Sequence, residues 1–311
     1  MLIASANLTE EQAHARMSLI QWSALAARMK REDSLSQLFA LSRFLHFNKS
    51  DTCSDAALKQ YLSNGWTTEA LLEQNLNSFA DDALKNSLVW AFPQAYYSVF
   101  SVTLGYFQVA GFTDGQTHAS LIRKFGDEAN LGHYPRNTSF LACGGIEHER
   151  TFLNCRKVAL PSTLHFDPVD SDVIDTHIAG LLSATRQADL RDRLLDRKLK
   201  TKSGKPKRKF AEAEYASVGA KLGYTSVLSF LYRKRIKSNY QDIDSILSAE
   251  LKADEIFPRI MQVVACLNAI HEAFIVRAIG RNAYTAILES LSSTITALPK
   301  TRFNDIKPGV A

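Results

Sequence analysis

The chain has 311 residues, of which 46% are hydrophobic and 22% are charged. This composition is too apolar for general disorder and fits one large or two medium-sized globular domains. The net charge of +5 permits contact with a polyanion, but it falls short of the concentrated positive charge of a protein that coats DNA.

Cysteine usage and the N-terminal sequence indicate the compartment. The four cysteines include no CxxC pair, so we expect a reducing environment and neither a disulfide scaffold nor a zinc module. The start, MLIASANLTEEQAHARM, has no basic leader followed by an apolar stretch, so no signal peptide is expected. We predict a cytoplasmic protein without metal or cofactor.

The N-terminal region, residues 1–80, is predicted to be helical. Thr9 and Gln12 match a capping box, which indicates a helix that runs to about Lys30. Shorter helices should follow, with Gly65 separating two of them as a C-cap residue.

A long helix is predicted from Asp81, because apolar residues recur at alternating steps of three and four, and Gly111 should end it. Part of this segment, residues 88–112, is the only candidate for a membrane span. Polar residues interrupt it, so we expect a buried core helix and no membrane contact. The residues of the apolar stripe are Tyr97, Phe100, Leu104 and Phe107.

The amino-acid composition changes in the middle of the chain. A turn at residues 114–115 should lead into a short helix that ends by Gly126 and carries His118. Residues 127–168 hold glycines and prolines among short β-branched and aromatic runs. This pattern predicts irregular structure or a small hairpin between helices.

A helix predicted over residues 170–197 precedes a lysine-rich connection at residues 198–209. One interpretation of this connection is a solvated, mobile link between two helices. The other is a flexible arm that contacts phosphates, because exposed lysines release counterions when they bind a polyanion. The arm's candidate contacts are Lys205, Lys207, Arg208 and Lys209.

Three more helices are expected after this connection. The first covers residues 210–235 and should break or kink near Gly219 and Gly223. The second covers residues 240–251, and the third is a single long helix over residues 254–298.

Two arginines, Arg277 and Arg281, lie in the apolar stripe of that last helix. Buried arginine is costly unless it is paired. These two either meet carboxylates such as Glu272 and Glu289, leave the core where the bundle splays, or line a basic cleft. The companions in such a cleft, with cationic groups suited to phosphate oxygens, would be Arg233, Lys234, Arg235 and Lys237.

Two segments separated by an insertion share features with a known family. AYYSVFSVTLGYFQVAGFTDGQTHASLIRKFG, residues 95–126, has paired tyrosines, a long aromatic helix, a glycine turn and a T-H-x-x-L-I-x-x-F run. RKRIKSNYQDIDSIL, residues 233–247, is an arginine-rich helix end followed by a short N/D-Y motif and another helix. Over residues 81–251 the chain resembles the higher eukaryote and prokaryote nucleotide-binding (HEPN) superfamily.

The resemblance implies an all-α, antiparallel helical bundle of HEPN type, with additional helices and the irregular or small β insertion near 127–168. On this basis we divide the chain into a helical region at 1–80, a bundle at 81–252 that includes the basic connection at 198–209, and a long C-terminal helix within 253–311 that packs on the bundle. The family further implies nucleic acid, above all RNA, as partner, and a homodimer or a partner protein in a prokaryotic defence or toxin–antitoxin system.

HEPN ribonucleases usually carry an arginine followed, after four to six residues, by a histidine, and no histidine here has that spacing. Metal-free RNA cleavage needs a group that exchanges a proton and a cation that stabilises the phosphorane. The matching place offers Arg235, Asn239 and Tyr240, of which only the arginine suits a phosphate.

Three functions therefore stay open. The leading one is a nucleic-acid-binding protein, with RNA as the expected ligand. The second is a metal-independent HEPN ribonuclease with a rearranged site, completed by His118 from a partner chain. The third is a helical subunit that binds another protein.

Overall fold

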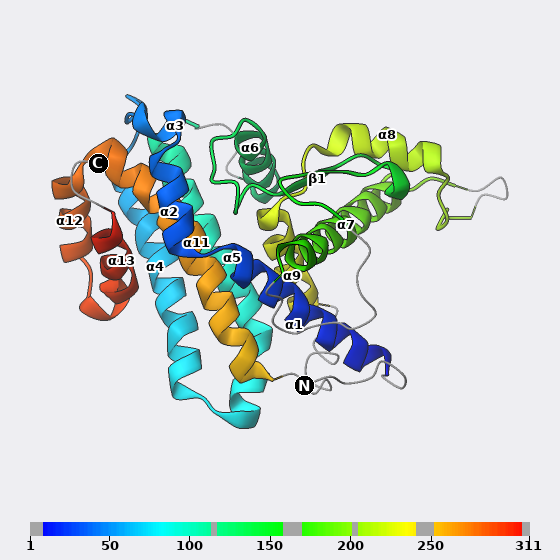
Figure 1. The fold of residues 1–311 in the computed structure, drawn as a ribbon, viewed down its shortest axis with the longest axis horizontal. Coiled ribbons are helices and arrows are strands. Elements are labelled where there is room, and N and C mark those ends of the chain that lie inside the picture. The colour runs from blue at the N-terminus through cyan, green and yellow to red at the C-terminus, as the bar shows by residue number, and fades with distance from the viewer. Residues whose placement is uncertain (1–8, 113–116, 158–169, 201–204, 241–251, 307–311) are drawn as a thin grey trace.

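The computed structural model describes residues 9–112, 117–157, 170–200, 205–240 and 252–306 (Figure 1). The protein is mostly helical with one small two-stranded sheet, which confirms the predicted all-α class with a small β insertion. The predicted helix at 240–251 falls almost wholly outside the described residues. In chain order the elements are α1 (Glu10–Arg28), α2 (Arg31–Phe39), α3 (Ser42–Leu45), α4 (Asp55–Ser78), α5 (Asp81–Val109), α6 (His118–Asn130), β1 (Leu141–Cys143), the 3₁₀ turn η1 (Glu147–Glu149), β2 (Thr151–Leu153), α7 (Ser171–Asp196), α8 (Glu212–Leu222), α9 (Val227–Tyr240), α11 (Ala253–Ile279), α12 (Arg281–Glu289) and α13 (Ser293–Asp305).

Three long helices, α4, α5 and α11, form the centre of the molecule (Figure 1). α5 packs against both α4 and α11, and it also contacts α9. α1 and α2 lie against α11, while α13 lies against α4. One hydrophobic core runs through these helices and fully buries Trp22, Trp66 and Phe257. Hence α5 links the core to the half of the molecule that holds α7, α8 and α9.

Gly65 does not end a helix, so that prediction was wrong. α4 continues through it to Ser78, and Gly65 is buried where α4 meets α5. A Cβ atom at this position would lie 2.6 Å from Cγ2 of Val102 and 3.1 Å from the carbonyl oxygen of Ser98. The glycine is therefore needed for the close approach of two helices rather than for a turn.

The segment at 88–112 belongs to α5 and is largely buried, as expected for a core helix. It is not, however, the segment that passes a test for membrane spans. α11 does so by length and composition, but 78% of its most apolar window is buried inside the protein. The apolar surface of α11 is thus already covered by protein, as in the core helix of a soluble fold.

The single C-terminal helix expected over 254–298 is instead three helices, α11, α12 and α13. Gly280 adopts a left-handed conformation with φ of 82°, which ends α11 and turns the chain into α12. The apolar stripe continues across this break, so periodicity alone did not reveal it. Folding back in this way brings α13 onto α4.

That return buries three charged side chains together. Arg302 of α13 donates to Glu69 of α4 from Nη1 to Oε1 over 2.6 Å, and to Glu272 of α11 from Nε to Oε2 over 2.7 Å. All three are at most 1% exposed. Each carboxylate accepts one further hydrogen bond: Trp66 Nε1 donates to Glu272 over 2.8 Å, and Asn268 Nδ2 donates to Glu69 over 3.1 Å.

The charges of this triad depend on one another. Burial raises the pKa of Glu272, and the nearby Arg302 opposes that shift. Burial by itself would lower the pKa of Arg302, but Glu272 and Glu69 raise it above the ordinary value. The guanidinium therefore keeps its charge, and it is the group that makes two buried carboxylates tolerable.

The predicted hairpin is present as β1 and β2, antiparallel with Leu141 opposite Leu153, although residues 158–169 lie outside the described part of the insertion. The preceding helix α6 reaches Asn130, beyond the expected end at Gly126. The expected break at Gly223 also occurs, with φ of 74°, and separates α8 from α9.

Gly219 does not break a helix. It lies within α8, where an added Cβ would be 2.3 Å from the Cα of Gly145, so the glycine lets the hairpin touch α8.

Arg186 of α7 joins the hairpin to the turn between α8 and α9. Its guanidinium is fully buried and donates to the carbonyl oxygens of Ala142, Gly144, Gly219 and Gly223. Burial lowers its pKa to about 10, so it remains charged near neutral pH. One side chain thus fixes where α9 begins.

We predict that Arg302→Met lowers the free energy of unfolding by about 3–5 kcal/mol, because two buried carboxylates lose their counter-charge. The matched control is Arg31→Met, which removes an ion pair of 3.1 Å to Asp305 whose side chains are 27% and 39% exposed, and should cost less than about 1 kcal/mol. Urea unfolding followed by circular dichroism measures both. Similar small losses in the two variants would contradict the structural role of the triad.

Candidate functional site

The three cations that follow one another on α9 point to different neighbours. Arg233 donates to Asp192 over 2.6 Å and to Asp189 over 3.5 Å, both on α7. Lys234 turns to α1, where Nζ bonds Oγ of Ser18 over 3.1 Å. Successive residues of a helix are about 100° apart around its axis, so the side chains of three consecutive residues point in three different directions.

Arg235 lies against tyrosine rings of α5 and α9. Its Cζ is 4.9 Å from the ring centre of Tyr97, 5.5 Å from that of Tyr232 and 5.9 Å from that of Tyr96. These distances are those of cation–π contacts. Tyr96 is fully buried, whereas Tyr97, Tyr232 and Arg235 are partly accessible.

His118 reaches the same rings from α6. The side chain of Thr117 caps this helix, so His118 is its first residue. Its Nδ1 is 2.8 Å from the hydroxyl of Tyr96, and its ring centre is 5.5 Å from Tyr232 and 4.5 Å from Phe100. His118 and Arg235 thus converge on one aromatic wall within a single chain. We call Tyr96, Tyr97, Phe100, His118, Tyr232 and Arg235 the His118–Arg235 cluster.

The cluster sets the protonation of its members. Burial lowers the pKa of His118, and the positive charge of Arg235 lowers it further, so the imidazole is neutral at pH 7. Burial raises the pKa of Tyr96 well above its ordinary value, so that hydroxyl keeps its proton. Because Tyr96 engages Nδ1, exchange of a proton with a ligand falls to Nε2 of His118.

Sequence reasoning named His118 and Arg235 but did not place them together in one chain. It also missed the tyrosines as site residues, although the Tyr96-Tyr97 pair stands in the segment that carries the family resemblance. The other expected members, Lys237, Asn239 and Tyr240, belong to the end of α9, and their side chains lie outside the described residues.

The basic connection does not join the cluster through any described contact. Nζ of Lys207 is 2.7 Å from Oε2 of Glu214 on α8, so this lysine is already paired. Lys205, Arg208 and Lys209 are exposed, in a segment that projects at the outer end of α7 and α8 (Figure 1).

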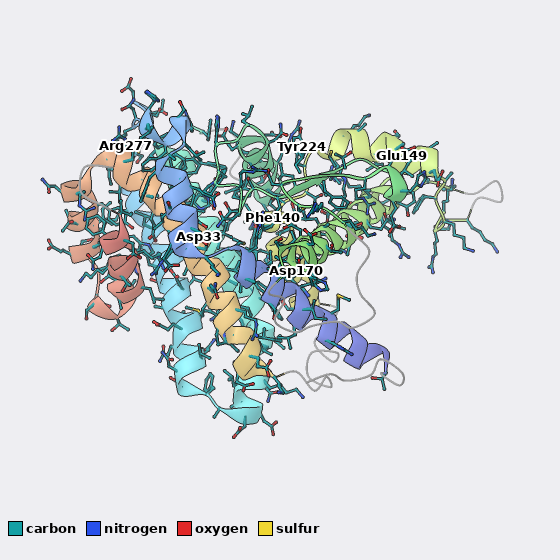
Figure 2. All side chains as sticks on the ribbon, viewed as in Figure 1. Asp33, Phe140, Glu149, Asp170, Tyr224 and Arg277 are labelled. Carbon is teal, nitrogen blue, oxygen red and sulfur yellow. The ribbon has the colours of Figure 1, made fainter. Side chains whose placement is uncertain are left out.

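No described contact brings Arg277 and Arg281 together with the α9 cations. Arg277 donates to the carbonyl oxygen of Leu45 over 2.7 Å. Cζ of Arg281 lies 4.0 Å from the ring centre of Phe303, and Nη1 donates to the carbonyl oxygen of Ile306, directly after α13. Figure 2 shows Arg277 far from Tyr224, which lies between α8 and α9. Glu272, suggested as their partner, binds Arg302 instead.

A groove of about 630 Å³ adjoins the cluster and shares Tyr232 with it. Its walls come from α6, α7, α8 and α9, and its charged lining includes Arg123, Asp189 and Arg193. Burial raises the pKa of Asp189 to about 6, although Arg233 opposes the shift. The volume is in the range of sites that hold a nucleotide-sized molecule.

In the part of the chain that the structure describes, no three His, Cys, Asp or Glu side chains gather as metal ligands would. In comparisons with models of protein families, with curated proteins and with solved structures, nothing matches this chain. The HEPN resemblance therefore still stands only on the two sequence segments, and function has to be argued from the cluster.

We predict that Arg235→Gln raises the pKa of His118, because a nearby positive charge that disfavours the imidazolium is removed. Arg233→Gln is the matched control, since Arg233 on the same helix binds the aspartates of α7 and should leave His118 unchanged. Histidine ring signals followed by NMR against pH measure the shift, with His118→Gln used for assignment. Equal titration in both variants would refute the cluster.

Proposed function

We propose that this protein binds RNA and that the His118–Arg235 cluster is the contact surface. The observation that carries the proposal is the convergence of Arg235 and His118 on the rings of Tyr96 and Tyr232. Single-stranded nucleic acid is commonly held by aromatic rings that stack on bases, combined with cations that meet the phosphates. Tyr97 and Tyr232, partly accessible, supply the rings, and Arg235 supplies the cation.

The charge distribution supports the same ligand. The chain carries a net charge of +5, which permits contact with a polyanion. Of the three consecutive cations on α9, Arg233 and Lys234 contact α7 and α1, which leaves Arg235 as the member of that run beside partly accessible tyrosines. The adjoining groove, which shares Tyr232 with the cluster, offers room for a base. A prokaryotic defence or toxin–antitoxin setting, a homodimer and a partner protein remain expectations from the family resemblance.

We predict that Arg235→Gln and Tyr97→Ala each weaken the binding of a fluorescent single-stranded RNA by about tenfold or more, because each removes a cation or a stacking ring. Arg136→Gln, which neutralises an exposed arginine outside the cluster, should leave the affinity within about twofold. Fluorescence anisotropy at several salt concentrations gives both the affinity and its dependence on salt.

Two controls separate the alternatives. Joint neutralisation of Lys205, Lys207, Arg208 and Lys209 tests the basic connection, and an unchanged affinity removes the arm from the binding surface. Association that is weak and insensitive to salt in the unmodified protein would contradict RNA binding and favour a subunit that binds another protein.

A second candidate, a metal-independent ribonuclease, is favoured by one specific observation. The cluster sets a neutral imidazole and a guanidinium against the same aromatic wall, within one chain. The two groups supply the functions that RNA cleavage without metal needs: proton exchange with the 2′-hydroxyl at Nε2 and stabilisation of phosphorane charge. In this candidate His118 comes from the same chain and not, as the sequence suggested, from a partner.

For the ribonuclease candidate we predict cleavage of total RNA or tRNA in the presence of a chelator, reduced at least about a hundredfold in His118→Ala, because general acid–base catalysis contributes on that order. Tyr96→Phe, which loses only the bond to Nδ1, should retain more activity than His118→Ala. Gel analysis of the products measures both. Intact RNA under all conditions would reject the enzyme while leaving RNA binding in place.

A further inference from the structure

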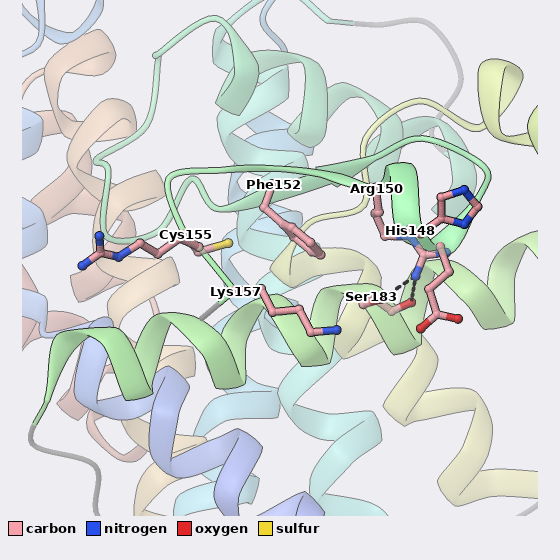
Figure 3. A pocket seen from close by; sticks show the side chains of 8 residues that line it. His148, Arg150, Phe152, Cys155, Lys157 and Ser183 are labelled. Atoms are coloured by element: carbon pink, nitrogen blue, oxygen red, sulfur yellow. Dashed lines mark hydrogen bonds between the residues drawn. The ribbon is translucent and has the colours of Figure 1, made fainter. Parts of the chain in front are cut away.

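A second cavity, distant in sequence from the His118–Arg235 cluster, opens between the hairpin and α7. It has a volume of about 440 Å³. The hairpin and the residues after it provide most of the lining, and Ser183 contributes from α7 (Figure 3). Its ionisable lining residues include Glu147, His148, Arg150, Arg156 and Lys157.

Arg150 is the buried cation of this cavity. It is 8% exposed, and its guanidinium donates to the carbonyl oxygen of Ser183 over 3.1 Å, to the hydroxyl of the same residue, and to Oε1 of Gln187 over 2.9 Å. All these acceptors are neutral, and its Nε has no partner. Among the described residues no carboxylate forms an ion pair with Arg150. A buried cation without a counter-charge is unfavourable.

The surroundings add to this positive charge. Arg186, which is fully buried and bonds carbonyl oxygens, lies close enough for the two guanidinium groups to repel each other. Lys157 also has no ion pair among the described residues, and its amino group points toward Ser183 from the other side of the cavity (Figure 3). Arg156, by contrast, is neutralised by Asp172.

Counter-charge inside the cavity is small. Among the described lining residues, Glu147 is the one carboxylate. It is exposed and acts on Arg150 only through space. Burial lowers the pKa of Arg150, and Glu147 opposes this shift without cancelling it. The site is thus complementary to a dianion placed between Arg150 and Lys157.

We propose that this cavity binds the phosphoryl group of a small phosphorylated molecule. Arg150 and Lys157 supply the two positive charges, and Ser183, which accepts from Arg150, keeps its own proton to donate to a phosphate oxygen. The cavity is larger than a phosphate ion, and the ring of Phe152 also lines it (Figure 3). The remaining space and this ring suit the organic part of a phosphate ester.

Titration calorimetry on the full chain tests the site with three probes: inorganic phosphate, adenosine monophosphate and adenosine. We expect the two phosphorylated probes to bind and adenosine not to bind. Tighter binding of the monophosphate than of phosphate assigns the cavity to phosphate esters, and equal binding assigns it to the free ion. The proposal would be overturned if adenosine bound as tightly as adenosine monophosphate. It would also be overturned if none of the three probes bound.

Variants locate the binding. Lys157→Gln is a surface change that leaves the hairpin contacts intact, and it should weaken both phosphorylated probes by about tenfold. Ser183→Ala should also weaken them. Lys59→Gln, an exposed lysine of α4, is the charge-matched control and should have no effect. If Arg235→Gln abolishes phosphate binding and Lys157→Gln does not, the anion binds at the His118–Arg235 cluster and this proposal is wrong.

Discussion

The buried pairing of Arg302 with Glu69 and Glu272 is the interaction on which the arrangement of the core depends. Three charges taken out of water are tolerated only in one relative position of α4, α11 and α13. The network continues into α5, because Asn268 bonds both Glu69 and the hydroxyl of Ser98. Ser98 follows Tyr97 directly, so the same bonds that satisfy the triad also fix the rotation of α5 that presents its tyrosines.

In the other half of the molecule, Arg186 holds the hairpin and the turn after α8 together. Its donors meet carbonyl oxygens of the hairpin and of the turn after α8, with no carboxylate among its bonds. The turn residue Thr225 pairs with Ala142 of β1, so the start of α9 is tied to the hairpin. A buried cation on α7, outside the cluster, therefore helps to hold α9 in the position at which Arg235 meets α5.

What the sequence predicted correctly was local. Helix periodicity located α5, α7 and most of α11, and the run of turn residues located the hairpin. Pairings between distant segments were not accessible: Arg302 lies 233 positions from Glu69 and outside any apolar stripe, while Arg277 and Arg281, inside one, turned out to be peripheral. In the site, His118 and Arg235 could be named as candidates from their residue types. Their contact could not be predicted, because sequence spacing does not tell how two helices separated by an insertion pack together.

The basic residues of α9 make different contacts, and this difference affects which kind of ligand the protein could bind. A run of basic residues in a sequence suggests a continuous positive surface, yet Arg233 and Lys234 stabilise contacts with α7 and α1. Among the described side chains of α9, one guanidinium lies beside the partly accessible tyrosines of the cluster. Such a surface offers one described cation for a phosphate, whereas recognition of a duplex backbone uses several phosphate contacts. It is better matched to an unpaired nucleotide, whose base can stack while a single phosphate meets the arginine.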